Sequence, residues 1–335
     1  MTRFHSIRFS NISRAILILL ALLVPSAAHA QWQAVAGAQS NDKGVQAMAF
    51  LPNEFWVHTD DSIQWTFATD EVHTVTFLVN NQIRPAVGIG CPPSPGGVQP
   101  SGSSYDGSAC VNSGRLLVGA TYSVTFPTRG NFKLVCLVHS EMTGVVHVLD
   151  QAEPLPHLQG FYDDQAAEAA RDLLSDVDHQ QGEAARAAHA IGYSSNTVIA
   201  GVGEVVATGG GRMFRVVMRF LGGPVRIHVG DTVEWTNWDP IAPHTITFGT
   251  EPANPATLVN VISDSDGARH GTINSATDNV SSGFLQAAPQ DRAGFAQPPA
   301  GVTRVRVTFT HEGVYDYICA LHDELGMKGQ VTVVR

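Results

Sequence analysis

Short runs of alternating apolar and polar residues predict that this chain is built from β-strands. One such run has apolar side chains at alternate positions on either side of a Gly230-Asp231 turn signal: Val225, Ile227, Val229, Val233 and Trp235. Successive side chains of a strand point to opposite faces, so the run predicts a strand, a turn and a second strand. Similar runs, separated by clusters of Gly, Pro, Asn and Asp, fill most of the chain. We expect an all-β protein made of antiparallel sandwiches.

The pattern occurs twice. Residues 50–66 align with residues 220–236 at an offset of 170 positions, with identical residues at Phe50, Leu51, His58, Asp61, Trp65 and Thr66. Self-similarity at a fixed offset indicates a repeated structural unit. We predict two tandem β-sandwich domains at 31–151 and 197–335, joined by a linker at 152–196.

The linker has the composition of an acidic helix. Residues 161–191 are rich in alanine; Asp163 or Asp164 can cap the start of a helix and Gly192 can end it. Residues 150–191 contain nine acidic residues and two arginines. Two interpretations stay open, a solvated connecting helix and a docking surface for a cationic partner. Three scattered histidines are expected to be exposed and without a ligand: His157, His179 and His189.

Each domain also carries a long polar insertion, at 80–114 and at 263–300. Their Ser, Asn, Gly and Pro content predicts surface loops. These loops either shape the site where a partner docks or have no function, and both interpretations stay open. Three apolar residues suggest that the second insertion packs partly on its domain: Phe284, Leu285 and Phe295.

Residues 1–30 predict a cleaved secretory signal. Three arginines precede a short apolar run at 15–24, and Ala28-His29-Ala30 fits a cleavage site. The alternative, a membrane anchor, is disfavoured because the run is too short to span a bilayer. No other long apolar run follows. We expect a periplasmic or secreted protein without stable membrane insertion.

Charge and cysteine content narrow the possible partners and the compartment. The formal net charge is −10, and removal of a signal with three arginines and no acidic residue changes it to −13. Such a charge disfavours nucleic acid and anionic membranes as partners. Cys91 and Cys110 flank a Pro/Gly/Ser-rich stretch. In an oxidising compartment these two predict a disulfide, with a thiolate metal site as the alternative.

The other two cysteines lie in candidate metal-binding loops. Near the C-terminus, Cys319, His322 and Met327 have the spacing Cys-x2-His-x4-Met, and His244 lies upstream. A thiolate, a thioether and imidazoles suit an ion that cycles between Cu(I) and Cu(II). Each residue alone has a simpler interpretation, such as a buried cysteine or a core methionine. The paired histidines His58 and His228 are expected to be structural.

The same constellation occurs in the first domain. Cys136, His139 and Met142 have the spacing Cys-x2-His-x2-Met, with His73 upstream. Two such sets in one chain make chance improbable, so we predict two copper ions with these ligands: His73, Cys136, His139 and Met142 for one, His244, Cys319, His322 and Met327 for the other.

These motifs resemble those of the plastocyanin/azurin family of blue copper proteins, the cupredoxins. The second loop is similar to that of plastocyanin and pseudoazurin, and the shorter first loop to that of amicyanin. The resemblance implies two Greek-key β-sandwiches, each with a type 1 copper site of two histidines, a cysteine and a weak axial methionine. It also implies that the loop histidines, His139 and His322, pass electrons through an apolar surface patch.

The resemblance implies electron transport between redox proteins, such as a c-type cytochrome and a dehydrogenase or oxidase. A copper-trafficking protein and, less favoured, a copper oxidoreductase subunit are the alternatives. Copper oxidases use His-x-His pairs, which this sequence lacks, and no histidine adjoins Cys136 or Cys319. No spacing supports a further site at His147, His270 or His311. We therefore predict a non-enzymatic carrier, and the unequal loops predict two different potentials.

Overall fold

The computed structural model describes residues 29–82, 84, 91, 97–175, 182, 184, 186, 196–286 and 302–335. The predicted signal lies outside these residues except for its last two positions, and His179, His189 and Phe295 also lie outside them. Within the described part of the chain, no helix is both long and apolar enough to cross a membrane.

The first unit is a β-sandwich. Its described strands are β1 (Gln31–Gln39), β2 (Val45–Leu51), β3 (Glu54–His58), β4 (Ser62–Phe67), β5 (Thr76–Phe77), β6 (Ser103–Ser104), β7 (Val111–Asn112), β8 (Thr121–Thr125), β9 (Gly130–Val135) and β10 (Thr143–Leu149). One sheet of the sandwich has the order β2-β1-β4-β8-β6 and the other has the order β3-β10-β9-β5-β7. Buried aromatic residues such as Trp65 and Phe77 fill the space between them, because alternate side chains of each strand point inward.

The second unit repeats this arrangement. Its described strands are β11 (Thr197–Ala207), β12 (Arg212–Leu221), β13 (Val225–His228), β14 (Thr232–Trp238), β15 (Thr247–Phe248), β16 (Leu258–Val259), β17 (Val261–Ser263), β18 (Arg269–Ile273), β19 (Val280–Ser282), β20 (Arg304–Phe309), β21 (Gly313–Ile318) and β22 (Lys328–Val334). One sheet has the order β17-β18-β20-β14-β11-β12 and the other β13-β22-β21-β15-β19-β16. Trp235 and Phe248 occupy the core positions that correspond to Trp65 and Phe77.

The predicted fold class is confirmed, with one correction to the strand pairing. The sheets are mixed rather than antiparallel, because β1 pairs parallel with β4 and β11 pairs parallel with β14. When the chain passes through the other sheet before it returns, the returning strand can run parallel to its neighbour. Neighbouring strands of one sheet therefore need not form a hairpin. The domain boundaries expected from the sequence stay predictions.

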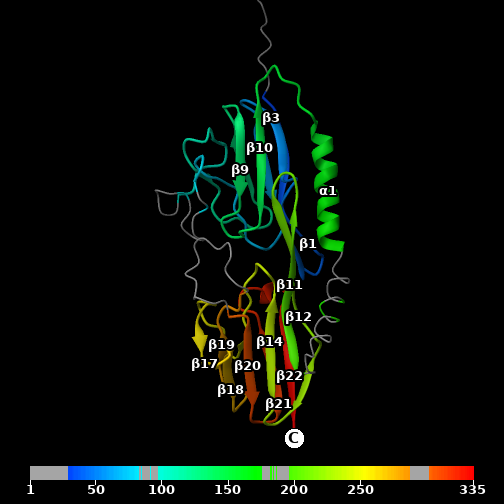
Figure 1. Ribbon diagram of the computed structural model, residues 1–335, viewed down its shortest axis with the longest axis vertical. Coiled ribbons are helices and arrows are strands. Elements are labelled where there is room, and N and C mark those ends of the chain that lie inside the picture. The colour runs from blue at the N-terminus through cyan, green and yellow to red at the C-terminus, as the bar shows by residue number, and fades with distance from the viewer. Residues whose placement is uncertain are drawn as a thin grey trace, which may run out of the picture.

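A continuous sheet joins the two units. Strand β12 pairs antiparallel with β2, in the register Phe214–Met48 to Val217–Val45, so one sheet of each unit merges into an eleven-stranded sheet among the described residues. Figure 1 shows the two units stacked along the long axis, with β11 and β12 reaching towards the first unit. All seven residues of β2 are buried. The interface is therefore part of the folded core rather than a loose contact.

The two insertions are not simple surface loops, which corrects the sequence prediction. The first contributes β6 and β7, and its Tyr105 is buried against Phe77 and Phe132. The second contributes β18 and β19, and it begins at the last residue of β17. Strand β18 pairs parallel with β20, and β19 pairs with β15 next to the candidate metal loop. Short strands rich in Ser and Asn do not show the apolar alternation that sequence analysis relies on.

The linker helix α1 (Gln159–Ser175) lies against the first unit, on the side of β1 and β2 (Figure 1). It begins before Phe161, so Asp163 and Asp164 lie inside the helix and do not cap it. Tyr162 is buried against Phe55, and its hydroxyl accepts a hydrogen bond from the backbone N–H of Trp56 at 2.9 Å. His157, expected to be exposed, is half-buried and stacks on Phe161. The helix is thus a packed element rather than a solvated connector.

Candidate metal centres

In the second unit, three predicted ligands converge at one buried point. The donor atoms of His244, Cys319 and His322 lie within 4.8 Å of one another. His244 Nδ1 is 3.2 Å from His322 Nδ1, and Cys319 Sγ is 3.4 Å from His322 Nδ1 and 3.9 Å from His244 Nδ1. All three residues are buried. Residues 75 positions apart thus point two ring nitrogens and a sulfur at one spot.

In the first unit, His73, Cys136 and His139 form the same cluster within 4.8 Å. His73 Nδ1 is 3.1 Å from His139 Nδ1, and Cys136 Sγ is 3.8 Å from His139 Nδ1. His73 and Cys136 have no exposed surface. The two clusters therefore agree in residue types and in the ring atoms that face inward, and they differ in that His139 is partly buried whereas His322 is buried.

The threonine after each upstream histidine holds the cysteine loop in place. In the second unit, the Thr245 backbone N–H donates to Cys319 Sγ at 3.3 Å, and its hydroxyl accepts the N–H of Ala320 at 2.7 Å. In the first, Thr74 does the same with Cys136 Sγ at 3.4 Å and the N–H of Leu137 at 2.8 Å. Hydrogen bonds of this kind fix ligand orientation before a metal arrives.

Both predicted methionine ligands are buried beside their cysteines. Met142 and Met327 have no exposed surface, and each shares a core cluster with the cysteine of its own unit. Their carbonyls accept the backbone N–H of Cys136 at 3.0 Å and of Cys319 at 3.1 Å. In the second unit, the longer loop accommodates a 3-10 helix, η1 (Asp323–Leu325), between the histidine and the methionine.

The electrostatics of both clusters favour thiolate sulfur. Burial alone would raise the pKa of Cys136, but hydrogen bonds with His139 and His73 outweigh it and hold this pKa well below its ordinary value. The pKa of Cys319 is also held well below its ordinary value, because the charges of His322 and a hydrogen bond with His244 outweigh the effect of burial. A thiolate is the form in which cysteine binds metals.

Two carboxylates that the sequence analysis missed, one partly buried and one fully buried, lie beside the histidines. In the first unit, Glu71 Oε1 lies 3.4 Å from His139 Nε2; in the second, Asp239 Oδ2 lies 3.8 Å from His244 Nε2. Burial lowers the pKa of both histidines, but hydrogen bonds with a cysteine and a carboxylate outweigh it and raise the pKa to about 9 in His139 and in His244. The available signal was weak, an acidic residue two or five positions before the upstream histidine.

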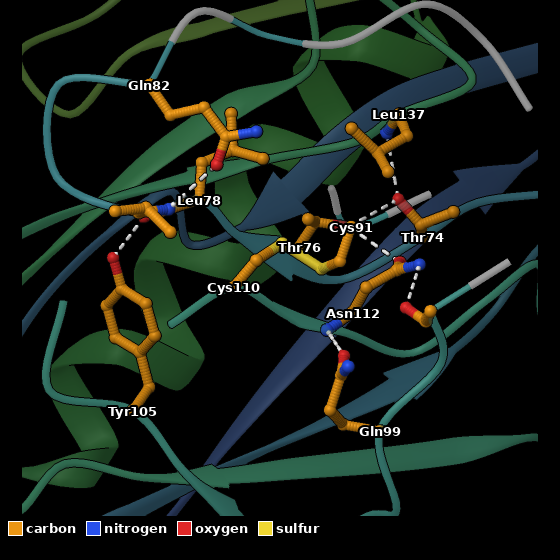
Figure 2. Close-up of a disulfide and its surroundings, with 12 residues drawn as sticks. Thr74, Thr76, Leu78, Gln82, Cys91, Gln99, Tyr105, Cys110, Asn112 and Leu137 are labelled. Atoms are coloured by element: carbon orange, nitrogen blue, oxygen red, sulfur yellow. Dashed lines mark hydrogen bonds between the residues drawn. A yellow bond between two sulfur atoms is a disulfide. The ribbon is translucent and has the colours of Figure 1, made fainter. Parts of the chain in front are cut away.

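The predicted disulfide is confirmed. Cys91 and Cys110 are bonded, with their Cα atoms 5.6 Å apart. Figure 2 shows that the bridge lies next to the segment that carries Thr74, whose hydroxyl accepts the Leu137 N–H. Cys110 precedes β7, which pairs with β5. The disulfide therefore fastens the first insertion beside the first cluster.

The remaining histidines considered in the sequence lie apart from both clusters. His58 Nε2 contacts the carbonyl of Glu153, and His147 lies between Glu54 and Asn131. His270 contacts Thr308 and Asp264, His311 contacts Thr310, and His228 lies near Asp231. Among the described residues, the two histidine–cysteine clusters are the groups that could hold a metal ion.

The loop histidines face a cavity between the units rather than the outer surface, which corrects the expectation of a surface patch. The cavity has a volume of about 440 Å³, and residues of both units line it, including Glu71, His139, Ala242 and His322. The His139 side chain is 11% exposed and lies 5.9 Å, between ring centroids, from Phe214 of the second unit. Each unit thus covers the loop histidine of the other.

Comparisons with known proteins agree with this picture. Residues 212–334 match the family model of copper binding proteins, plastocyanin/azurin family. No protein of curated function matches the sequence. Similar solved structures include plastocyanin from the fern Dryopteris crassirhizoma (16% identity, 41% of this chain and 99% of that one, TM-score 0.22) and a purple cupredoxin from Nitrosopumilus maritimus (24%, 41% and 98%, 0.20). A copper nitrite reductase from Nitrosomonas europaea is also similar (11%, 92% and 95%, 0.22).

The fold and the two clusters define a class, a double β-sandwich protein with a histidine–cysteine–histidine cluster in each sandwich that could hold a metal ion. Within the second unit, residues 212–334 match the model of the plastocyanin/azurin family of copper binding proteins. The first unit is linked to the second by the repeated sequence and by the matching contacts of Thr74 and Thr245.

Proposed function

We propose that the chain is an exported blue copper protein that transfers single electrons, with one type 1 copper ion in each unit. The ligands would be the two predicted sets: His73, Cys136, His139 and Met142, and His244, Cys319, His322 and Met327. Export rests on the predicted signal at 1–30. The observation that carries the proposal is the convergence of two inward-facing Nδ1 atoms and a thiolate, built twice in one chain.

The donor set fits copper. The two imidazoles and the thiolate of each cluster would hold the ion, and the buried thioether of Met142 or Met327 would add a soft sulfur donor, a donor set that suits copper. When bound, copper supplies a one-electron couple between Cu(II) and Cu(I). The residues supply a cage that is already formed, because Thr74 and Thr245 hold the cysteine sulfurs without a metal. A preformed cage changes little between the two oxidation states.

Electron transfer is favoured over the other functions by the closed form of the sites. His73, Cys136, His244 and Cys319 have no exposed surface, whereas a protein that hands copper to a partner needs reachable ligands. The arrangement around the shared cavity suits a relay between the two centres within one chain. The external partners would be redox proteins such as a c-type cytochrome or a dehydrogenase or oxidase.

Copper reconstitution tests this function. We expect about two copper ions per chain, with an intense thiolate-to-copper visible band and a type 1 EPR signal. Cys136→Ser and Cys319→Ser should each remove one ion and the matching part of the band. His147→Gln, which changes a histidine outside both clusters, should leave the spectrum unchanged. An oxidised, copper-loaded protein without the band would exclude the proposal.

A further inference from the structure

Glu71 lines the cavity between the two units and lies next to a loop histidine. Its carboxylate lies 3.4 Å from His139 Nε2, and its side chain is 14% exposed. His139 and His322, the loop histidines of the two clusters, line the same cavity as Glu71. A single, largely buried carboxylate thus lies in the cavity that the loop histidines of both clusters share.

The contact with Nε2 constrains how His139 can bind a metal. A carboxylate beside Nε2 favours the ring form that keeps its proton on Nε2 and donates it in a hydrogen bond, which leaves the Nδ1 lone pair free to bind a metal. Nδ1 is the atom that faces His73 and Cys136. Carboxylates placed in this way fix the ring and strengthen the histidine as a donor.

The second unit lacks this device and has a different one. The residue two positions before its upstream histidine, equivalent to Glu71, is Ala242, which lines the same cavity. Asp239 contacts His244 instead, and the equivalent position in the first unit is Ala68. Each cluster therefore has one outer carboxylate, but on a different histidine. Only the carboxylate of the first unit lies between the two clusters.

We propose that Glu71 is a positioning residue that holds His139 and couples the two centres electrostatically across the cavity. The inference rests on the proposed copper function. A negative charge stabilises the more highly charged oxidised ion, and in a buried site this effect is weakly screened. Glu71 lowers the reduction potential of both centres, most strongly that of the first, whose ligand it touches.

The decisive variant is Glu71→Gln, which keeps the size and an acceptor oxygen and removes the charge. Midpoint potentials are measured with single centres, in full-length Cys319→Ser for the first and Cys136→Ser for the second. We expect an upward shift at both centres, roughly twice as large or more at the first. The shift at the second centre is expected because Glu71 and His322 line the same cavity, and a purely local structural role of Glu71 would not produce it.

Two matched controls separate charge from contact. Glu71→Asp keeps the charge and shortens the side chain, so it should shift the first potential and leave the second nearly unchanged. Glu54→Gln removes the carboxylate of another Glu–His pair, Glu54 with His147 at 3.2 Å, away from the cavity. It should change neither potential.

A readout without copper completes the test. Nitrogen NMR of the copper-free protein above pH 9, where the His139 ring is neutral, should show the ring proton on Nε2 in the wild type and a changed signal for this ring in Glu71→Gln. If the wild-type chain binds no blue copper, the proposed function fails. If both centres are blue and Glu71→Gln leaves both potentials unchanged, the inference about Glu71 is overturned while the function stands.

Discussion

At the residue scale, a glycine in each unit makes room for the upstream histidine. Gly37 in β1 and Gly201 in β11 have φ angles of +76° and +77°, and each lies where the strand register shifts. A Cβ atom on Gly37 would lie 2.8 Å from His73 Nε2, and one on Gly201 would overlap the His244 ring. The bulge therefore brings bare backbone against each candidate ligand, which side chains larger than hydrogen would prevent.

We expect Gly201→Ala to destabilise the protein by about 2–4 kcal/mol, because left-handed strain adds to the overlap with His244. It should also reduce copper binding at the second centre, measured from the thiolate-to-copper band, while the first centre keeps its band. Denaturant unfolding gives the stability change.

Gly223→Ala is the matched control. Gly223 has the same φ of +76°, but no described atom lies within 4 Å of its added Cβ. It should cost only about 1–2 kcal/mol from backbone strain and leave both copper bands intact. Equal losses of copper in the two variants would contradict the proposed role of Gly201.

Sequence reasoning identified the ligands because they are chemically distinctive and recur at similar spacings. It missed Gly201, Asp239 and Glu71, because their importance depends on partners far away in the sequence or on the facing unit. A glycine within an apolar strand and an acidic residue before a histidine are common in proteins without metal sites. Only the fold places them against His244 and His139.

At the scale of elements, the two insertions pack next to the strands that follow the upstream histidines and so support the candidate metal sites. Strands β7 and β19 extend the sheets next to β5 and β15, which directly follow the upstream histidines. Equivalent serines hold these segments, since Ser113 accepts the N–H of Val75 and Ser282 accepts the N–H of Ile246. These strands could not be recognised in the sequence, because they are two or three residues long and largely polar. They are defined by burial of their backbone rather than by an apolar pattern.

Removal of the disulfide tests this support in the first unit. The double variant Cys91→Ser/Cys110→Ser should lower the free energy of unfolding by about 3 kcal/mol. The disulfide joins cysteines that are 19 positions apart in the sequence, and without it the unfolded chain gains conformational entropy. The loss should appear in denaturant unfolding of the first unit and should weaken copper retention at the first centre. Unchanged retention at the first centre, with the loss of stability, would show that the insertion does not support the site.

At the scale of the whole molecule, the shared sheet makes the two units one folding body. Arg219 of β12 adds to the junction, donating to the carbonyl of Leu325 at 2.7 Å and to the carboxylate of Asp42 at 3.0 Å. Leu325 lies in the ligand loop of the second unit, and Asp42 in the turn before β2 of the first. Stability and the geometry of both sites are thus linked across the interface.

We expect the full chain to unfold in a single cooperative transition, with equal calorimetric and van't Hoff enthalpies. Arg219→Ala should cost about 2–3 kcal/mol, since the hydrogen bonds of its guanidinium group to Asp42 and Leu325 are lost at a partly buried site. Arg335→Ala, which removes an exposed ion pair with Glu312, should have almost no effect. Two well-separated transitions in the wild-type protein would contradict this prediction.

The pairing of β2 with β12 also determines how the protein can be dissected. If either unit were produced alone, the backbone N–H and C=O groups along the exposed edge of β2 or β12 would have no partner. An apolar strand edge with unpaired backbone groups can pair with the same edge of a second copy, so truncated halves should self-associate and precipitate. Single-centre forms are better made by ligand substitution within the intact chain than by cutting it.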